Sequence, residues 1–175
     1  MSLAGRSYAV LVAEGVEDLE YWVTVMRLRE EGAVVVSVGS DTDPHRGKNG
    51  LAVRADALAS EVDASALDGL VIPGGWAPDK MRRDPAIVEL TRAVHAAGKP
   101  IGIICHGGSV AISAGIVGGR ATGSLGIKDD LVNAGARWVD EAAFRDGTLV
   151  WGRVVADIPD FCRELVALFE EHAGS

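Results

Sequence analysis

The sequence contains few cysteines and few basic residues, and both shortages exclude classes of protein. Two cysteines among 175 residues cannot build a disulfide framework, which favours a reducing, cytoplasmic location. Lysine and arginine total 17 against 25 acidic residues, and the net charge of −8 argues against nucleic acid or an anionic membrane surface as a partner. Cysteine and histidine pairs at metal-ligand spacing are also missing, so the sequence indicates neither a metal site nor a cofactor.

Long apolar runs are absent as well. No run approaches the length of a membrane span. The first apolar run, residues 8–13, is followed by Glu14, Glu17 and Asp18, and acidic residues there do not fit a signal peptide. Hydrophobic residues nevertheless make up 48% of the chain, enough for a buried core. Because repeats, low-complexity tracts and linkers are also missing, residues 1–175 are expected to form a single domain.

Short apolar runs alternate with segments of helical periodicity along the whole chain. The runs are apolar at consecutive positions, which is typical of parallel strands covered by helices on both faces. The sequence therefore predicts an α/β fold, a doubly wound and mostly parallel sheet. Strands are expected over 8–13, 33–39, 69–72, 101–104, 137–139 and 149–151, a side ribbon over 51–55, and helices over 16–31, 85–97, 109–114, 127–134 and 159–172.

A cysteine lies where the 101–104 strand turns into the next helix. Cys105 is followed by His106 and two glycines, which allow the backbone a tight turn and allow a substrate to approach closely. Such a nucleophile elbow places the thiol near unpaired N–H groups at a helix start, an environment expected to lower its pKa and raise its reactivity. The alternative is a buried cysteine that acts as a small hydrophobic residue.

Two other segments are expected to meet this elbow. In parallel sheets the ligand crevice lies beyond the carboxyl ends of the strands. Residues 14–20 follow the first strand, residues 73–79 follow the third and residues 105–109 contain the elbow. The topology therefore predicts that these three segments form one site.

A set of motifs spread over nearly the whole chain resembles the PfpI/ThiJ family. This flavodoxin-like superfamily also contains the parkinsonism-associated protein, glyoxalase III and the PfpI intracellular protease. The PfpI branch fits best. The motifs are Glu17-Asp18-Leu19-Glu20, Val71-Ile72-Pro73-Gly74-Gly75, Ala77-Pro78-Asp79, Gly98-Lys99-Pro100, Ile104-Cys105-His106-Gly107, Ile112-Ser113-Ala114-Gly115, Lys128-Asp129-Asp130-Leu131-Val132-Asn133-Ala134-Gly135 and Trp138-Val139-Asp140.

The resemblance implies a thiol, a carboxylic acid and a histidine at the centre of the site. Cys105 resembles the family's nucleophile, Glu20 the acid that hydrogen-bonds the thiol, and His106 the histidine that follows it. A buried glutamate has a raised pKa and can remain protonated, so Glu20 and Cys105 are expected to titrate as a coupled pair. Taken without the resemblance, Glu20 would be a solvated charge on a helix.

Glycine turns and a second acid complete the implied site. The amides of Gly75 and His106 are expected to stabilise an oxyanion, with Gly74 and Gly107 beside them. Asp79 matches the position at which a glutamate from a neighbouring subunit orients the histidine, which implies a homo-oligomer, either a dimer or a hexamer. The alternative for Asp79 is an exposed acid at the start of a helix.

Three segments differ from the family pattern and are expected to border the pocket. These are Gly108-Ser109, the shortened 120–126 segment, and residues 150–153 with Trp151. Trp151 is interpreted either as a pocket wall or as a core residue. Cys162 lies within the last predicted helix and is expected in the core.

The resemblance favours a cysteine-dependent enzyme that acts on small α-oxoaldehydes or glycated adducts, as glyoxalase III and the deglycases do. A PfpI-type peptidase and a non-enzymatic redox sensor or chaperone using an oxidisable Cys105 remain alternatives. A glutamine amidotransferase is rejected, because that chemistry needs a histidine and a glutamate after the cysteine. The sole histidine beyond His106 is His172, near the chain end.

Overall fold

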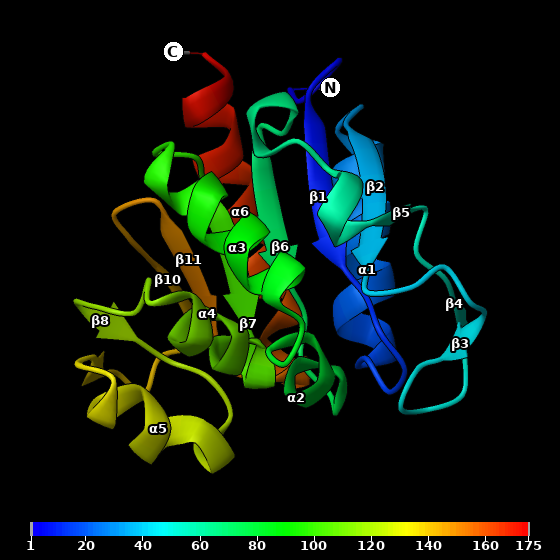
Figure 1. Cartoon of the computed structure of the whole chain (residues 1–175). Helices are drawn as coiled ribbons and strands as arrows, with labels where there is room; N and C mark the ends of the chain where they lie inside the picture. Colours follow the sequence, from blue (N-terminus) through cyan, green and yellow to red (C-terminus); the bar gives the residue numbers. More distant parts are fainter. Residues whose placement is uncertain (1, 175) are drawn as a thin grey trace.

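The computed structural model describes residues 2–174 and is built around one seven-stranded sheet (Figure 1). Neighbouring strands are parallel except at one edge, where a hairpin adds an antiparallel strand. The predicted α/β fold with a mostly parallel sheet is confirmed. Across the sheet the strands are β10 (Ala143–Asp146), β11 (Leu149–Gly152), β7 (Ile101–Ile104), β6 (Gly69–Ile72), β1 (Ser7–Leu11), β2 (Val34–Gly39) and β5 (Ala57–Leu58).

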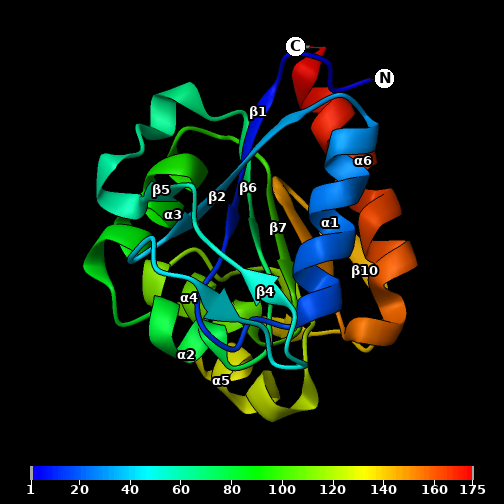
Figure 2. The ribbon, with the colours of Figure 1, turned by 90° about the vertical axis from the view of Figure 1, so that its right-hand side faces the viewer.

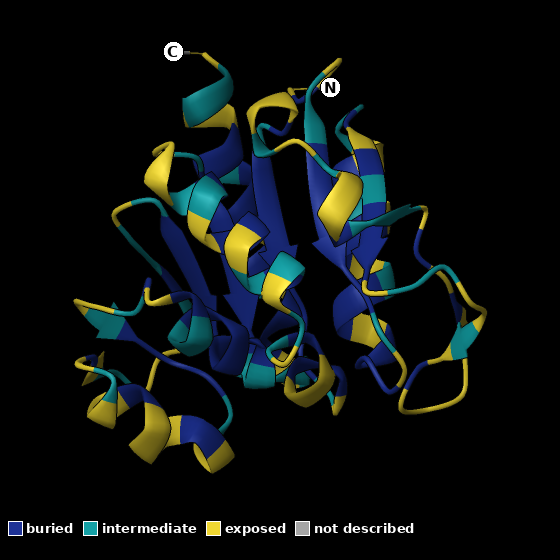
Figure 3. Ribbon diagram, viewed as in Figure 1, coloured by how far each residue is buried: buried dark blue, intermediate teal, exposed yellow. Residues whose placement is uncertain are grey.

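Helices cover both faces of this sheet. Figure 2 shows one pair of helices on one side of the strands and a second group on the other. Because both faces are covered, β6, β7 and β11 are buried along their whole length, as Figure 3 shows for the centre of the molecule. One face carries α1 (Asp18–Glu30) and α6 (Ile158–Ala173), the other carries α2 (Ala77–Met81), α3 (Pro85–Ala96) and α4 (Gly108–Ala114), and α5 (Lys128–Asn133) lies beyond the strand ends.

The ends of α3 follow from local chemistry. The Asp84 carboxylate accepts a hydrogen bond of 2.9 Å from the Ala86 amide, and Pro85 occupies the first helical position. At the other end Gly98 adopts φ +71°, a left-handed conformation that favours glycine and ends the helix. Helix α3 therefore occupies nearly the whole of the helix predicted over 85–97.

The apolar residues that predict α1 do not form its buried face. Leu19, Val23 and Met26 recur at helical spacing, yet their exposed fractions are 48%, 36% and 61%. The buried positions include the polar residues Glu20 and Thr24. Helix α1 therefore buries a face on which these polar residues lie among Tyr21, Val25 and Leu28, and it leaves an apolar stripe facing outward.

Two predicted strands pair differently from expectation. Residues 137–139 were predicted to belong to the sheet, but β9 (Arg137–Trp138) pairs with β8 (Arg120–Ala121) in a separate ribbon. The strand that pairs with β11 is β10, across a tight turn in which Gly147 adopts φ +61°. The expected side ribbon does form, from β3 (His45–Arg46) and β4 (Ala52–Val53).

Asp157 directly precedes α6, where an aspartate is expected to cap the helix. The Asp157 side chain makes no capping hydrogen bond. Its carboxylate instead pairs with the guanidinium of Arg153 at 2.9 Å, because the short helical turn before α6 brings the two side chains together.

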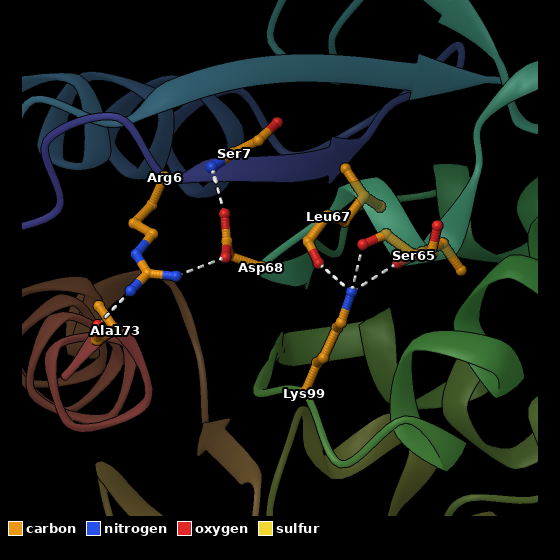
Figure 4. A network of polar contacts seen from close by, with 8 residues as sticks. Arg6, Ser7, Ser65, Leu67, Asp68, Lys99 and Ala173 are labelled. Carbon is orange, nitrogen blue, oxygen red and sulfur yellow. Dashed lines mark hydrogen bonds and ion pairs between the residues drawn. The ribbon is translucent and has the colours of Figure 1, made fainter. Parts of the chain in front are cut away.

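A polar network joins the two ends of the chain at the amino-terminal ends of the parallel strands (Figure 4). Asp68 accepts hydrogen bonds from the Ser7 amide at 2.7 Å and from the Arg6 guanidinium at 3.1 Å. Arg6 also donates to the carbonyl of Ala173 at the end of α6. The network therefore joins the start of β1, the start of β6 and the end of the last helix.

Lys99 holds the turn before β6 in the same region (Figure 4). Its ammonium group donates to the carbonyls of Ala64 and Ser65, both at 2.9 Å, and to that of Leu67. Ala64 and Ser65 belong to a short helical turn and Leu67 ends it, so Lys99 gathers the carbonyls of this turn around one cation. Within residues 2–174, no helix is both long and apolar enough to cross a bilayer.

Candidate active site

The loops that follow β1, β6 and β7 meet around a cavity of about 690 Å³ at the carboxyl ends of the strands. This is the convergence predicted from the topology. The 153–157 turn after β11 adds a further wall to the cavity. The cavity is lined by Glu17, Lys48, Gly75, Trp76, Pro78, Asp79, Lys80, Cys105, His106, Ser109, Ser124, Val154, Val155 and Ala156.

Cys105 lies at a strained elbow between β7 and α4. Its φ is +59°, and no other non-glycine residue between 2 and 174 has a positive φ. The turn is tight because the next residues pack against β6: a Cβ on Gly107 would lie 2.3 Å from the Ile72 carbonyl oxygen. The elbow leaves the thiol half-buried at the floor of the cavity. Backbone strain of this kind is concentrated at functional sites.

Glu20 reaches the elbow from the first turn of α1 and is fully buried. Its Oε2 accepts a hydrogen bond of 2.7 Å from the Gly74 amide, whereas Oε1 has no hydrogen-bond partner. Burial raises the pKa of Glu20 to about 7, and hydrogen bonds from Gly74 and Cys105 offset part of this effect. The expected raised pKa is confirmed, and Glu20 is no solvated helix charge.

The thiol does not have the lowered pKa expected from its position. Burial and, after it, the negative charge of Glu20 raise the pKa of Cys105 to about 12, although the amides of His106 and Gly75 lower it in part. The expectation was wrong because loss of hydration outweighs the nearby N–H groups. Together the two pKa values mean that the Glu20–Cys105 pair holds one proton between about pH 7 and about pH 12.

The His106 ring lies next to the Cys105 thiol. Its Nδ1 is 3.4 Å from the Cys105 Sγ. Burial lowers the pKa of His106, and the positive charge of Lys48 lowers it further, so the ring is neutral at pH 7. A neutral imidazole can accept a proton or a hydrogen bond at this position.

The predicted oxyanion amides divide into two groups. The amides of Gly75 and His106 both interact with the Cys105 thiol, and Gly75 adopts φ +81° to present its amide there. Gly74 has a different role, because its amide is used by Glu20 and a Cβ would lie 2.7 Å from the Glu20 Oε2. Gly107 is buried against β6 and is not part of the cavity lining.

Asp79 lies at the rim of the cavity, on α2. Its side chain is 77% exposed and pairs with Arg83 at 3.0 Å. Within this chain it is therefore an exposed acid near a helix start, as in the alternative interpretation. Contact between Asp79 and the histidine of a neighbouring subunit remains a prediction.

Sequence reasoning missed Lys48 and Glu17 as cavity residues. Lys48 lies in a turn between two short strands, where a glycine-rich sequence predicts a loop and nothing more. Its Nζ is 3.4 Å from the buried carboxylate of Glu17. Position 17 could have been found, because it is one helical turn before Glu20, but the contact between the loop and α1 is tertiary and leaves no sequence pattern.

The segments that differ from the family pattern lie in two different environments, the cavity lining and the core. Ser109 and Ser124 line the cavity, as expected for the first two segments. Trp151 is fully buried in the core and is no pocket wall. Cys162 is buried on α6, which confirms its assignment to the core.

Metal-ligating side chains do not cluster in the described part of the chain, where no group of three or more histidine, cysteine, aspartate or glutamate residues could hold an ion.

Comparison with known families and curated proteins gives a consistent result. The model of the DJ-1/PfpI family matches residues 6–168. The chain is 38% identical to Deglycase PfpI of Pyrococcus furiosus over 161 residues, which covers 91% of this chain and 97% of that protein. It is 35% identical to Protein/nucleic acid deglycase 2 of Escherichia coli over 167 residues, with 93% and 97% covered.

Solved structures show the same fold. A two-domain protein from Anabaena variabilis, with DJ-1/ThiJ/PfpI-like and ferritin-like domains, superposes with a TM-score of 0.91 at 38% identity. The match covers 93% of this chain and 47% of that one, so this chain spans about half of the two-domain protein.

Proposed function

This chain belongs to the DJ-1/PfpI family, and we propose that it is a cysteine-dependent enzyme that acts on small α-oxoaldehydes or the glycated adducts they form. Cys105 is the nucleophile, Glu20 moves the proton, and the amides of Gly75 and His106 hold the oxyanion. The curated relatives named as deglycases support this substrate class.

One observation carries the proposal: a buried glutamate with one unpaired oxygen interacts with the thiol at the cavity floor. Glu20 Oε2 is fixed by the Gly74 amide, while Oε1 is free to accept a proton. A carboxyl group with a pKa of about 7 changes protonation state readily at neutral pH, as a general acid and base must.

The proposed reaction on methylglyoxal begins with addition. The Cys105 sulfur forms a bond to the aldehyde carbon, the thiol proton passes to Glu20, and the carbonyl electron pair moves to oxygen, which the two amides stabilise. The oxyanion takes the proton back from Glu20 to give a hemithioacetal.

The remaining steps return the thiol. Glu20 removes the proton from the carbon bonded to sulfur and delivers it to the neighbouring carbon. The hydroxyl proton on the first carbon moves to the oxygen of the second, and the hemithioacetal becomes a thioester. Water then displaces the thiol and releases lactate. No external oxidant is required, because one carbon is oxidised as its neighbour is reduced.

The test measures methylglyoxal consumption and lactate formation without glutathione. We expect turnover by the wild type and a loss of at least 100-fold in Cys105→Ser and Glu20→Gln, since removal of a nucleophile or a general base removes large rate factors. Cys162→Ser is the matched control, because Cys162 is a buried thiol far along the chain on α6, and it should retain activity.

Other results would contradict the proposal. Cleavage of peptides abolished by Cys105→Ser, without aldehyde turnover, would indicate a peptidase. A wild type that turns over neither substrate, while mild peroxide adds two oxygens selectively to Cys105, would indicate a redox sensor.

We further propose that the protein works as a homo-oligomer in the cytoplasm. The apolar stripe of Leu19, Val23 and Met26 on α1 supports self-association, because it exposes large apolar side chains at helical spacing. Both cysteines are free thiols, which fits a reducing compartment.

A further inference from the structure

The cavity is larger than a three-carbon aldehyde requires. Its volume of about 690 Å³ falls within the range of roughly 300–1,000 Å³ that holds drug-sized ligands. Beside the nucleophile it contains the side chains of two lysines, Lys48 and Lys80. These cations are notable in a chain with a net charge of −8.

The loop that carries Lys48 is held against α1 at several points. Both oxygens of Asp18 accept backbone hydrogen bonds, from Asn49 at 2.6 Å and from Leu51 at 2.7 Å. The Lys48 amide donates to the Val16 carbonyl at 2.8 Å. These hydrogen bonds fix the backbone around Lys48 against the start of α1. The position of Lys48 is therefore better defined than that of a lysine on a free surface loop.

Lys48 and its counter-ion Glu17 both line the cavity, and the lysine is the more exposed of the two. The Lys48 side chain is 41% exposed, and that of Glu17 is 6% exposed. The Asn49 side chain also donates to Glu17, at 2.9 Å, which holds the carboxylate in place. A ligand in the cavity therefore meets the cation of this ion pair.

Lys80 adds a second cation on the same wall. Its Nζ donates to the Glu14 carbonyl at 3.2 Å, so it contacts the same 14–17 segment as Lys48. Within residues 2–174, no carboxylate lies within ion-pair distance of Lys80. The acid at the cavity rim, Asp79, is already paired with Arg83.

We propose that the cavity selects carbonyl substrates that carry an anionic group, a carboxylate or a phosphate, which Lys48 and Lys80 bind while the carbonyl carbon meets Cys105. This inference rests on the proposed function, since it names the substrate class of the same site. Both lysines are exposed residues of the cavity lining, so their charges are accessible to an anionic group on a bound ligand.

The test compares two α-oxoaldehydes of equal chain length, 4,5-dioxopentanoate, which carries a carboxylate, and uncharged 2-oxopentanal. We expect the wild-type kcat/KM to be at least tenfold higher for the anionic substrate. Lys48→Met should lower kcat/KM for that substrate by at least tenfold more than it lowers the value for 2-oxopentanal. Lys48→Arg should restore most of the preference.

Lys80→Met should act in the same direction, and Lys128→Met is the matched control. Lys128 lies over the Trp138 ring on α5 and is not part of the cavity lining, so its loss should leave both substrates unaffected. Equal losses for the two aldehydes in Lys48→Met, or no preference in the wild type, would overturn the proposal.

A binding measurement separates this inference from the proposed function. Calorimetry on Cys105→Ala with 4-oxopentanoate, an unreactive keto acid, should give a Kd at least tenfold weaker when Lys48→Met is added. If the wild type turns over neither aldehyde, the proposed function fails, and Lys48-dependent binding of the keto acid still supports the anionic site. Absence of binding, or binding that ignores Lys48, overturns it.

Discussion

Burial of Glu20 ties the stability of the protein to pH. The pKa of Glu20 rises from 4.5 to about 7 on folding, so the folded state binds a proton more tightly than the unfolded chain. The contribution of this group to the free energy of unfolding is fully present below pH 4.5 and is lost as pH rises through about 7.

Glu20→Gln should remove this pH dependence. Between pH 4 and pH 8 the free energy of unfolding of the variant, relative to the wild type, should rise by about 3 kcal/mol. Denaturant titrations across this range measure it. Glu31→Gln is the control, because pairing with Arg27 lowers the pKa of Glu31 to about 2, so its contribution to stability is lost as pH falls below about 4.5 and not as pH rises through 7. Parallel curves for Glu20→Gln and wild type would contradict the prediction.

Gly74 is a second residue on which the site depends. A Cβ there would lie 2.7 Å from the Glu20 Oε2 and 2.8 Å from the Cys105 Cβ. Gly74→Ala should therefore lower kcat/KM for methylglyoxal by at least tenfold, because it displaces the acid from the thiol. Gly118→Ala, at a position with open space around it, should leave kinetics unchanged. Similar activity in both variants would show that Glu20 needs no such close packing.

Individual site residues were predictable to different degrees. Cys105 and Glu20 could be placed at one site because strand order and the motifs agree. The pKa of the thiol could not, since it depends on how much water the folded cavity excludes. Lys48 could not be predicted as a cavity residue for a related reason, because only its tertiary contact near the start of α1 brings it to the cavity.

At the scale of elements, the outward stripe of α1 predicts self-association. Replacing Val23 and Met26 with glutamate should reduce the mass measured by light scattering to that of a monomer, because charges are costly to bury in an apolar contact. Val132→Glu on α5, at a position 45% exposed, is the control and should leave the mass unchanged. A wild type that is already monomeric would contradict the proposed oligomer.

The core strands were predictable from sequence, and the peripheral ones were not. β6 and β7 match their predicted bounds because each is a short, fully apolar run. β9 was assigned to the wrong sheet, since two residues carry no information about their pairing partner. The stripe on α1 predicted a helix correctly but could not show which face the sheet covers.

For the whole molecule, the end of the sheet opposite the site holds the stability contacts. Lys99→Met removes the charged donor shared by the carbonyls of Ala64, Ser65 and Leu67. It should lower the free energy of unfolding by about 2 kcal/mol, since lost charged hydrogen bonds are worth about 1.5–3 kcal/mol. The kcat/KM should stay unchanged because the cavity is at the other end of the strands. A loss of activity in the folded variant would show that the two ends are coupled.

The left-handed backbone at Cys105 has an evolutionary consequence. A side chain in this conformation costs roughly 1–2 kcal/mol, and glycine would adopt it freely. Selection for stability alone therefore works against the nucleophile, and only selection for reactivity retains it. Among gene copies released from that second pressure, we expect this cysteine to be replaced early, while the surrounding fold persists.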